Sequence, residues 1–428
     1  MKKIFNIAGV LVMAAVITVT AADPAARIQS KDWKERAEAV KNISSSTAED
    51  KIGLVSRVIN DEKHHVRMAA VETLIELSTP TAIAPLTEIL NDNRRDIRMR
   101  ALEGLISFGE EAADSIGLAL KDENEEIRTK ALEAITEMSE NTAVRYFDLA
   151  IEDESREIRE KVIEELYNIG RARQGAGRGQ IIWILSKAIT DSRRDLRIKA
   201  VNYIASLDGE TAIEALVPAS AHTDSDTRMA ALRALEQIGG ASSVEPISRY
   251  LEDEKREIRM KCLRILSKMN YPSALMSLSA AVNDDHYTIR TEAVNILSVK
   301  GNSTIVTSLS RSLNDHDWDI RLRAVYALAS IGDSVSIDAI GKALTDNDRR
   351  VQKAAVRILG VLGSSGSVEP LGKLFVADRY HRIDIAEAFS KIGDRAALKY
   401  LLEVLPDEKS EIKEAIEKSV ENIIAQNK

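Results

Sequence analysis

Residues 171–179 form the part of the chain that is richest in groups able to bind an anion. Three arginines, Arg171, Arg173 and Arg178, are interspersed here with three glycines. Arginine pairs with phosphate or carboxylate groups, and glycine-rich backbone can turn its amide groups toward an anion. The spacing matches no phosphate-loop fingerprint, and no strand is predicted before it. The stretch is therefore either a site for a small anion or an inserted surface loop that the fold tolerates.

Histidine, cysteine and acidic side chains form no recognisable metal-binding or catalytic motif. Residues 315–319 read Asp-His-Asp-Trp-Asp, which matches the first three ligand positions of a calcium loop but lacks its glycine and its closing glutamate. The six histidines do not have the spacing of a zinc site, and no nucleophile motif is present. Cys262 is the single cysteine, and its position in an apolar column indicates a core residue. We therefore predict a protein that is not an enzyme and that uses no metal or cofactor.

The candidate groups stand on a framework that repeats about every 31 residues. An arginine near the start of an amphipathic segment recurs along the chain, and we call it the marker arginine. Its successive positions are 31 residues apart, with one step of 30 and one of 38. The marker arginines are Arg36, Arg67, Arg98, Arg128, Arg159, Arg197, Arg228, Arg259, Arg290 and Arg321. Gln352 takes this place in repeat 11, and repeats 12 and 13, around residues 383–384 and 412–413, lack the arginine. Such a period indicates stacked repeats that share one continuous core.

Each repeat contains the signals of two antiparallel helices. A small residue lies three positions after the marker, and aliphatic residues follow at four and seven positions, which is the spacing of one helix face. A glycine often lies eleven positions after the marker, as at Gly170 and Gly332, where it can end the helix. We call the marker helix B and the apolar segment before it helix A. The sequence therefore predicts an all-α fold, a right-handed α-solenoid of about thirteen two-helix repeats.

The N-terminal residues have the features of a secretory signal peptide. Lys2 and Lys3 precede an apolar run that ends in small residues near position 22. The organisation that we expect is a signal peptide over residues 1–22, a capping helix in 23–43, and repeats over 44–428 with an inserted loop at 171–179. An uncleaved membrane anchor is the alternative for the first segment. We expect a periplasmic or secreted protein with no membrane span after cleavage, and its net charge of −8 argues against nucleic-acid binding.

Two surface columns of the B helices, at positions two and five after the marker, point away from the apolar face. Acidic residues become rare in these columns after the middle of the chain. A second candidate feature is a ridge of arginine and aromatic residues three positions before the marker. The binding residues that we predict from the columns and the ridge are Lys199, Arg233, Lys261, Arg264, Tyr287, Trp318, Arg323, Tyr326 and Arg357. The alternatives are a solvated face with local ion pairs and rings that fold back onto their own turns.

The repeat resembles the HEAT-like repeats of bacteria, the type also found in phycobilisome lyases. The resemblance covers roughly residues 30–425 and is carried by Asp315, the Ile320-Arg321 pair, Ala324 and Gly332 and by the matching positions of other repeats. It implies B helices on the concave side and a ladder of Asp and Arg residues between repeats. His222 replaces the Asp in repeat 7. No histidine is followed by glutamate, as it is in the metal hydroxylases built on HEAT repeats.

These observations favour an exported scaffold that binds a protein partner in the cell envelope through the B-helix surface of repeats 6–11. One alternative is binding of an anionic polymer or small anion through the basic column and the Arg-Gly stretch. Another alternative, a lyase-type enzyme, is implied only by the family resemblance. Bilin attachment is cytoplasmic chemistry in that family, so the signal peptide argues against it.

Overall fold

The structure, a computed structural model, describes residues 24–47, 49–207, 209–300 and 303–428. All regular elements in these ranges are α-helices or short 3-10 helices. The chain divides into two compact units, Met1–Leu207 and Asp208–Lys428. The predicted signal peptide over residues 1–22 lies outside the described ranges. Of the described helices, none combines the length and the apolar character needed to cross a bilayer.

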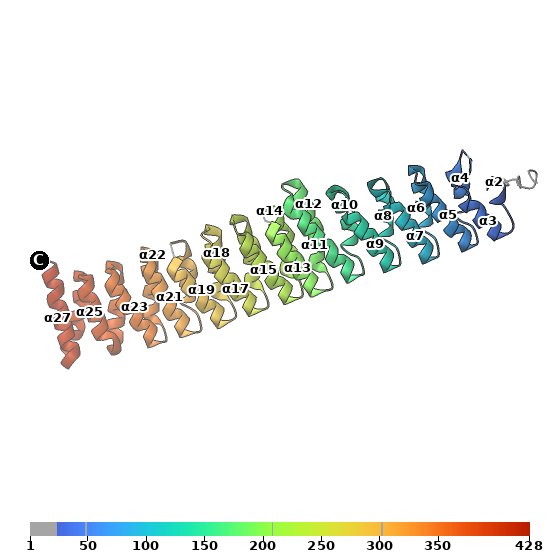
Figure 1. The fold of residues 1–428 in the computed structure, drawn as a ribbon. Helices are drawn as coiled ribbons and strands as arrows, with labels where there is room; N and C mark the ends of the chain where they lie inside the picture. Colours follow the sequence, from blue (N-terminus) through green and yellow to red (C-terminus); the bar gives the residue numbers. More distant parts are fainter. Residues whose placement is uncertain (1–23, 48, 208, 301–302) are drawn as a thin grey trace, which may run out of the picture. The chain divides into compact units, whose positions relative to one another are not determined.

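The first unit is a stack of helix pairs in which an A helix and a B helix alternate along the chain (Figure 1). Each B helix packs against the next B helix, and each A helix packs against the B helix that follows it. The B helices are α3 (Trp33–Lys41), α5 (His64–Leu77), α7 (Arg95–Ile106), α9 (Glu125–Thr136), α11 (Arg156–Ala172) and α13 (Arg194–Leu207). The A helices are α4 (Lys51–Ser56), α6 (Ile83–Ile89), α8 (Ala113–Ala119), α10 (Glu140–Ala150) and α12 (Ala176–Lys187), and the short α2 (Pro24–Arg27) precedes α3.

The second unit repeats the same alternation and the same pairing of neighbours. Its B helices are α15 (Ser225–Ile238), α17 (Arg256–Lys268), α19 (Tyr287–Lys300), α21 (Trp318–Ile331), α23 (Arg349–Leu362), α25 (Arg382–Ile392) and α27 (Ser410–Gln426). Its A helices are α14 (Glu210–Leu216), α16 (Val244–Ser248), α18 (Pro272–Ala280), α20 (Val306–Ser312), α22 (Ser334–Lys342), α24 (Val368–Ala377) and α26 (Leu398–Val404), several of them extended by a 3-10 turn.

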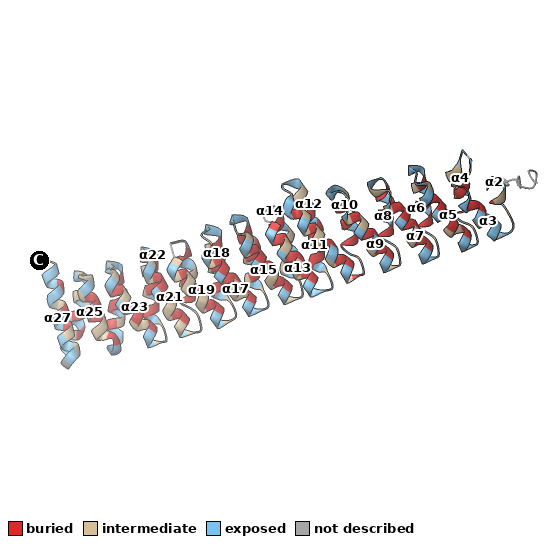
Figure 2. Ribbon diagram, viewed as in Figure 1, coloured by how far each residue is buried: buried red, intermediate tan, exposed pale blue. Residues whose placement is uncertain are grey.

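The core of each unit lies between the A and B helices, as the buried faces in Figure 2 show. The small residue three positions after the marker is completely buried wherever it occurs, for example at Ala101 and Ala324. A small side chain at this position lets neighbouring helices approach closely. Gly332 and Gly363 adopt the left-handed backbone conformation that ends α21 and α23. The prediction of an all-α solenoid of two-helix repeats is confirmed.

Nine marker arginines each connect their own repeat to the next repeat through two sets of hydrogen bonds. The Nη1 atom donates to the carbonyl oxygen six residues earlier, at 2.7–3.0 Å. The Nε and Nη2 atoms donate to the two carboxylate oxygens of an aspartate in the next repeat, with Nε distances of 2.5–2.8 Å. The pairs are Arg36–Asp61, Arg67–Asp92, Arg98–Asp122, Arg128–Asp153, Arg159–Asp191, Arg228–Asp253, Arg259–Asp284, Arg290–Asp315 and Arg321–Asp346. The ladder that the resemblance implied is confirmed for these pairs.

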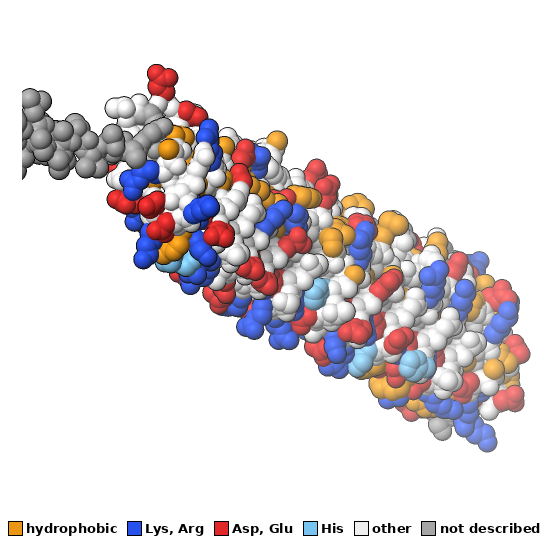
Figure 3. Space-filling view, turned by 90° about the vertical axis from the view of Figure 1, so that its right-hand side faces the viewer, with side chains coloured by type: hydrophobic (Ala, Val, Ile, Leu, Met, Phe, Trp, Pro, Cys, Tyr) orange, Lys and Arg blue, Asp and Glu red, His pale blue; other side chains and the backbone are white. Residues whose placement is uncertain are grey.

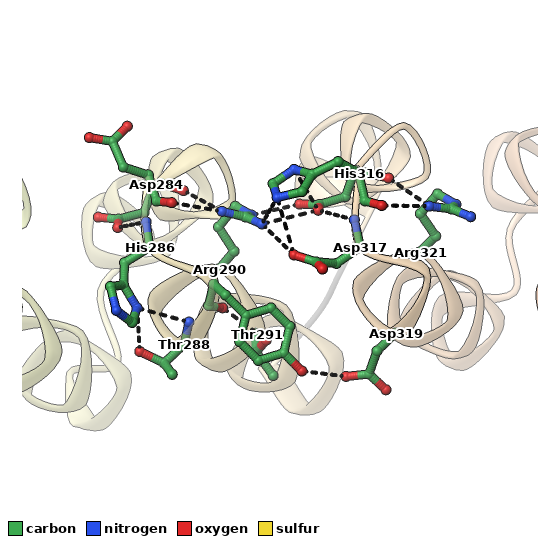
Figure 4. Close-up of polar contacts among 12 residues, drawn as sticks. Asp284, His286, Thr288, Arg290, Thr291, His316, Asp317, Asp319 and Arg321 are labelled. Carbon is green, nitrogen blue, oxygen red and sulfur yellow. Dashed lines mark hydrogen bonds and ion pairs between the residues drawn. The ribbon is translucent and has the colours of Figure 1, made fainter.

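The aspartate of each pair also stabilises the turn that begins its own B helix. One carboxylate oxygen accepts a hydrogen bond from the backbone N–H two residues later, as between Asp284 and His286 at 2.8 Å (Figure 4). In repeat 7, His222 occupies the position of this aspartate. Its ring nitrogen Nδ1 accepts the hydrogen bond from the N–H of Asp224 at 2.9 Å. The replacement therefore preserves the hydrogen bond that shapes the turn.

The insertion after repeat 5 is helical, and the prediction of a loop over residues 171–179 is wrong. Helix α11 continues through Gly170, and α12 already begins at Ala176, so a connection of three residues remains. Gly170 does not end the helix. A Cβ atom at this position would lie only 3.0 Å from the side chain of Leu207. Gly170 therefore permits close packing inside the unit, and the extra residues lengthen the helices on both sides.

Arg382 is the marker arginine of repeat 12, and it lies one residue before position 383, which a step of 31 predicts. This residue follows Gln352 by 30 residues, which is the shorter of the two regular steps. Its Nη2 atom donates to the carbonyl of Val376 at 3.1 Å, six residues earlier, and its Nη1 atom contacts the buried Glu408 of the next repeat. The longer glutamate thus replaces the aspartate of the ladder. The prediction that repeat 12 lacks a marker arginine is wrong because we assumed a step of 31.

An uncharged hydrogen bond connects repeats 11 and 12. The Nε2 atom of Gln352 donates to the carbonyl of Asp346 at 2.7 Å, as a marker arginine would, and its Oε1 lies 2.8 Å from Nε2 of His381. The His381 ring is fully buried, and its Nδ1 atom has no hydrogen-bond partner among the described atoms. Burial lowers the pKa of His381, because the protonated ring would place a charge and a second N–H donor in the core.

We predict that Arg321→Ala lowers the free energy of unfolding of the second unit by about 3 kcal/mol, because it leaves the Asp346 carboxylate buried without its cation. Chemical denaturation measures this loss, and hydrogen exchange locates it in α21 and α23. The double variant Arg321→Met/Asp346→Leu removes both charges, so it should recover part of the loss. A double variant as unstable as Arg321→Ala would show that the unpaired carboxylate is not the cause.

We also predict that acid weakens the attachment of the last repeats through His381. The folded state holds this ring below its ordinary pKa of 6.5, so stability is fully present above that value. It decreases as the pH falls below about 6.5, because only the unfolded state binds the proton readily. Asp378 and Asp384 oppose the shift, whereas Arg349 and Lys353 increase it.

Hydrogen exchange of α25 and α27 between about pH 7.5 and pH 5.5 tests this prediction. Protection should decrease with acid in the wild type and change much less in His381→Gln, which keeps a hydrogen-bonding side chain but does not titrate. The same pH response in both proteins would assign the effect to another group.

Candidate binding surface on the B helices of the second unit

A ridge of arginine and aromatic side chains follows the turns that begin the B helices of the second unit. Four members lie three positions before the marker, or before Gln352, and are the first residues of α17, α19, α21 and α23, whereas Tyr380 lies two positions before Arg382. The members are Arg256, Tyr287, Trp318, Arg349 and Tyr380. The side chains of Tyr287, Trp318 and Tyr380 are 41%, 36% and 54% exposed. The turns fixed by the ladder therefore place partly exposed rings at regular intervals along one edge of the B-helix row.

The hydroxyl of Tyr287 connects two neighbouring repeats. It donates to Oδ2 of Asp319 at 3.0 Å, and Nε of Arg323 donates to the same carboxylate at 2.9 Å. Figure 4 shows Asp319, which lies on the neighbouring helix α21 and accepts this hydrogen bond from the tyrosine hydroxyl. Arg323 and the tyrosine hydroxyl lower the pKa of Asp319, because both stabilise its charged form. The ring thus lies against the next repeat and does not fold back onto its own turn.

A guanidinium group covers one face of the Trp318 ring. The Cζ atom of Arg350, in the next repeat, lies 3.3 Å from the ring centroid, the geometry of a cation–π contact. Asp348 binds Arg350 through two hydrogen bonds of 3.0 and 2.7 Å. Arg350 lowers the pKa of Asp348 to about 2, so this carboxylate is charged at neutral pH. Asp348 therefore fixes the position of Arg350, and Arg350 in turn fixes the indole ring of Trp318.

The side chains at the two ends of the ridge also contact side chains of neighbouring repeats. The Cζ atom of Arg349 lies 4.3 Å from the Tyr380 ring centroid, and the edge of His381 meets the same ring. At the other end, Arg256 contacts the ring nitrogen Nε2 of His286 at 3.2 Å and the carboxylate of Glu257 at 3.1 Å. Three aromatic rings of the ridge therefore each contact a side chain of an adjacent repeat, which fixes their orientation before any partner binds.

Asp315, His316 and Asp317 bring three potential metal ligands within 4.8 Å of one another. The guanidinium of Arg290 already occupies the space between them (Figure 4). Its Nη2 atom lies 3.2 Å from Asp315, 3.1 Å from His316 and 2.8 Å from Asp317. A marker arginine is therefore the cation that contacts all three groups of this cluster, which belongs to the ladder.

The predicted basic residues of the B helices fall into two groups. Those in the first group form ion pairs, because Lys261 contacts Glu236 at 2.6 Å, Arg323 contacts Asp319, and Arg357 contacts Asp384 at 3.0 Å. The second group consists of Arg233 and Arg264, which are exposed. Among the described residues, neither has an ion-pair partner within 4.0 Å. Tyr326 lies in the same column and is 57% exposed.

Lys199 and the arginines of the 171–179 stretch lie in the first unit and contact protein groups there. Lys199 contacts Glu160 and Glu164 at 2.5 and 2.9 Å. Arg173 donates to Glu140 and Asn141, Arg178 donates to the carbonyls of residues 173 and 207, and Arg171 lies over the Tyr167 ring. These contacts connect the lengthened α11 and α12 to neighbouring residues, and an anion at the stretch would compete with them.

Ion pairs between exposed charges also occur along the rest of the B helices. Arg100 contacts Glu103 at 2.8 Å, and Lys130 contacts Glu133 at 3.7 Å, three residues apart on one helix. On the face that Figure 3 shows, acidic and basic side chains are interspersed. Local pairs of this kind are typical of a solvated helix face.

Some residues of the surface were missed by the sequence reasoning. Arg350 occupies a position where other repeats have an acid, so its contact with Trp318 could have been suspected from that exchange. Val299 and Val361 lie nine positions after their markers and are 86% and 72% exposed. They could have been found by following this column, because other repeats have a polar residue at the same position, such as Glu76, Lys268 and Ser330.

The comparisons with known proteins come from sequence and from structure. A sequence profile described as HEAT repeats matches residues 24–106, 181–246, 219–298, 278–351, 306–383 and 337–421. No curated protein matches the chain.

Several solved structures resemble this chain. One is an engineered protein that is 18% identical in sequence; the match covers 94% of this chain and 98% of that chain, with a TM-score of 0.25. Human deoxyhypusine hydroxylase in complex with glycerol is 18% identical, with 59% and 96% covered and a TM-score of 0.26. Kap121p is 12% identical, with 94% and 53% covered and a TM-score of 0.35, so the chain spans about half of its length.

We predict that Arg350→Ala uncovers the Trp318 ring without unfolding the protein. In a Trp33→Phe/Trp183→Phe background, Trp318 is the remaining tryptophan, and acrylamide quenching of its fluorescence should increase. The loss of stability should stay below about 1 kcal/mol, the size of an exposed cation–π contact. Arg350→Lys serves as the control and should give intermediate quenching. Equal quenching in all three proteins would show that Arg350 does not cover the ring.

Proposed function

Because the chain belongs to the HEAT-repeat family, we propose that it is a non-enzymatic scaffold that binds a protein partner through the B-helix surface of its second unit. Stacked repeats give a long surface whose helices are held in place from one repeat to the next. The observation that carries the proposal is the ridge of Tyr287, Trp318 and Tyr380. Its rings are partly exposed and regularly spaced, and each contacts a neighbouring repeat.

Physical properties of the ridge match those of residues that dominate protein interfaces. Tryptophan, tyrosine and arginine are the residue types most enriched among binding hot spots. Contacts with Asp319, Arg349 and Arg350 already fix the three rings. Binding would therefore immobilise few additional side chains, which reduces the entropic cost of association. The ridge supports protein binding for these two reasons.

The alternatives have weaker support. Anion binding at Arg171, Arg173 and Arg178 would have to replace the internal contacts of Arg173 and Arg178 and the stacking of Arg171 on Tyr167. The lyase-type alternative rests on the family resemblance alone, and the contacts of the ridge add nothing to it. We therefore keep the scaffold as the proposed function.

Export of the scaffold is a further part of the proposal. Its support is the sequence of residues 1–22, where two lysines precede an apolar run that ends in small residues. The partner would then be a protein of the cell envelope or of the exterior. N-terminal sequencing of the protein isolated from cell fractions tests this part, and an intact N-terminus in the cytoplasmic fraction would contradict it.

We predict that Trp318→Ala weakens binding of the natural partner by roughly 2 kcal/mol, or about thirty-fold, as expected for a hot-spot residue. The partner is identified by cross-linking in intact cells and mass spectrometry, and its affinity is then measured with purified proteins. Trp183→Ala is the matched control, because Trp183 is also exposed and also has a cation, Lys187, over its ring, but lies on an A helix of the first unit. It should change the affinity less than about three-fold. Equal effects of the two variants, or none, would contradict the proposed surface.

A further inference from the structure

On successive B helices, the residues five positions after the marker, or after Gln352, form what we call column five. In the second unit its members up to repeat 11 are Arg233 on α15, Arg264 on α17, Asn295 on α19, Tyr326 on α21 and Arg357 on α23, and all of them except the half-buried Asn295 are exposed. Packed helices lie about 8–10 Å apart, so column five presents one side chain at each such interval. Along the unit the side chains change from two arginines to an asparagine and a tyrosine, and the last is Arg357, which contacts Asp384.

The arginines at the start of column five differ from the other cations of the surface. Lys261 and Arg323 are half-buried and contact carboxylates. Arg233 and Arg264 are exposed on adjacent helices, and the described residues supply no carboxylate within ion-pair distance of either one. In the first unit the same column holds glutamates, such as Glu103 and Glu133, that pair with basic residues of their own helices. Within column five of the second unit, the cations without an ion-pair partner among the described residues therefore lie on α15 and α17.

Exposed apolar side chains accompany column five near Tyr326, toward its other end. Tyr326 on α21 is flanked along the row by Val299 on α19 and Val361 on α23, and all three are more than half exposed. The valines lie four residues, about one helical turn, after column five on their own helices. Water-exposed valines gain free energy from contact with another apolar group. This end of the column thus offers an apolar contact that a purely anionic ligand cannot use.

We propose that the partner contributes an extended acidic segment, with carboxylates at Arg233 and Arg264 and an apolar side chain at Tyr326, between the helices that carry Val299 and Val361. This inference rests on the proposed function and specifies the kind of partner. An extended chain advances about 3.3 Å per residue, so carboxylates three residues apart match adjacent helices. An apolar residue about six positions further on reaches α21. A sulfated or phosphorylated glycan would satisfy the arginines but not the valines.

The probe is a fluorescein-labelled ten-residue peptide with glutamate at its first and fourth positions, phenylalanine at its tenth, and glycine or serine elsewhere. We expect fluorescence anisotropy to detect its binding to the full chain, and the affinity to fall steeply with salt. Glutamine in place of both glutamates should weaken binding roughly tenfold. Absence of peptide binding, or equal affinity for the glutamine peptide, would overturn the proposal.

Variants of the chain assign the contacts. Arg233→Glu/Arg264→Glu should weaken peptide binding roughly tenfold. The control Arg311→Glu/Lys342→Glu makes the same charge change on the A helices α20 and α22 and should leave the affinity within about twofold. Equal losses in the two variants would overturn the inference. Circular dichroism confirms that each variant is folded.

Tyr326→Ala distinguishes a peptide from an anionic polymer. It should weaken the phenylalanine peptide but not a version with glycine at the tenth position. Dextran sulfate that binds through Arg233 and Arg264 more tightly than the peptide, with no effect of Tyr326→Ala on either ligand, would replace the acidic segment by an anionic polymer. Loss of natural-partner binding in Trp318→Ala together with no peptide binding would leave the proposed function in place and overturn only this inference.

Discussion

The buried arginine–aspartate pair between successive repeats is the interaction on which the rest of the structure depends. Two charges in the core are tolerated only when their hydrogen bonds are satisfied together. The guanidinium meets this condition because it donates to a carbonyl of its own repeat and to both carboxylate oxygens of the next. The carboxylate also accepts a backbone N–H in its own turn. Each pair therefore fixes the turn of one repeat and the position of its neighbour.

The surface of the B helices follows from this constraint. Because every ladder pair fixes a turn at the same point of the repeat, side chains three positions before the marker recur at regular places. Tyr287 then comes within reach of Asp319, and Trp318 comes within reach of Arg350. The contacts that orient the ridge are thus consequences of the ladder. The candidate binding residues lie at repeat positions that do not pack in the core, so their residue types can differ from one repeat to the next.

The sequence alone predicts the features that recur in every repeat, but it does not predict the features that occur only once. The helical pairs and the small buried column follow from periodicity, because each position faces the same surroundings in every repeat. Gly170 was misread because the same residue type can end a helix or permit close packing. Arg382 was missed because the step before it is one residue short. The arginine at position 350, where other repeats have an acid, hints at the contact with Trp318, but the distance between the two side chains depends on the packing of two repeats.

The two ends of each ladder arginine contact groups that every repeat can supply, a backbone carbonyl and an aspartate. The pairs Arg259–Asp284 and Arg290–Asp315 make the same bonds to a carbonyl and to both carboxylate oxygens. Removal or duplication of one complete repeat would therefore create a junction with the same bonds as those it replaced. An insertion of part of a repeat has no such junction and must be absorbed within a helix pair, as in α11 and α12. The gene can thus lengthen or shorten this protein in whole modules while its internal bonding stays the same.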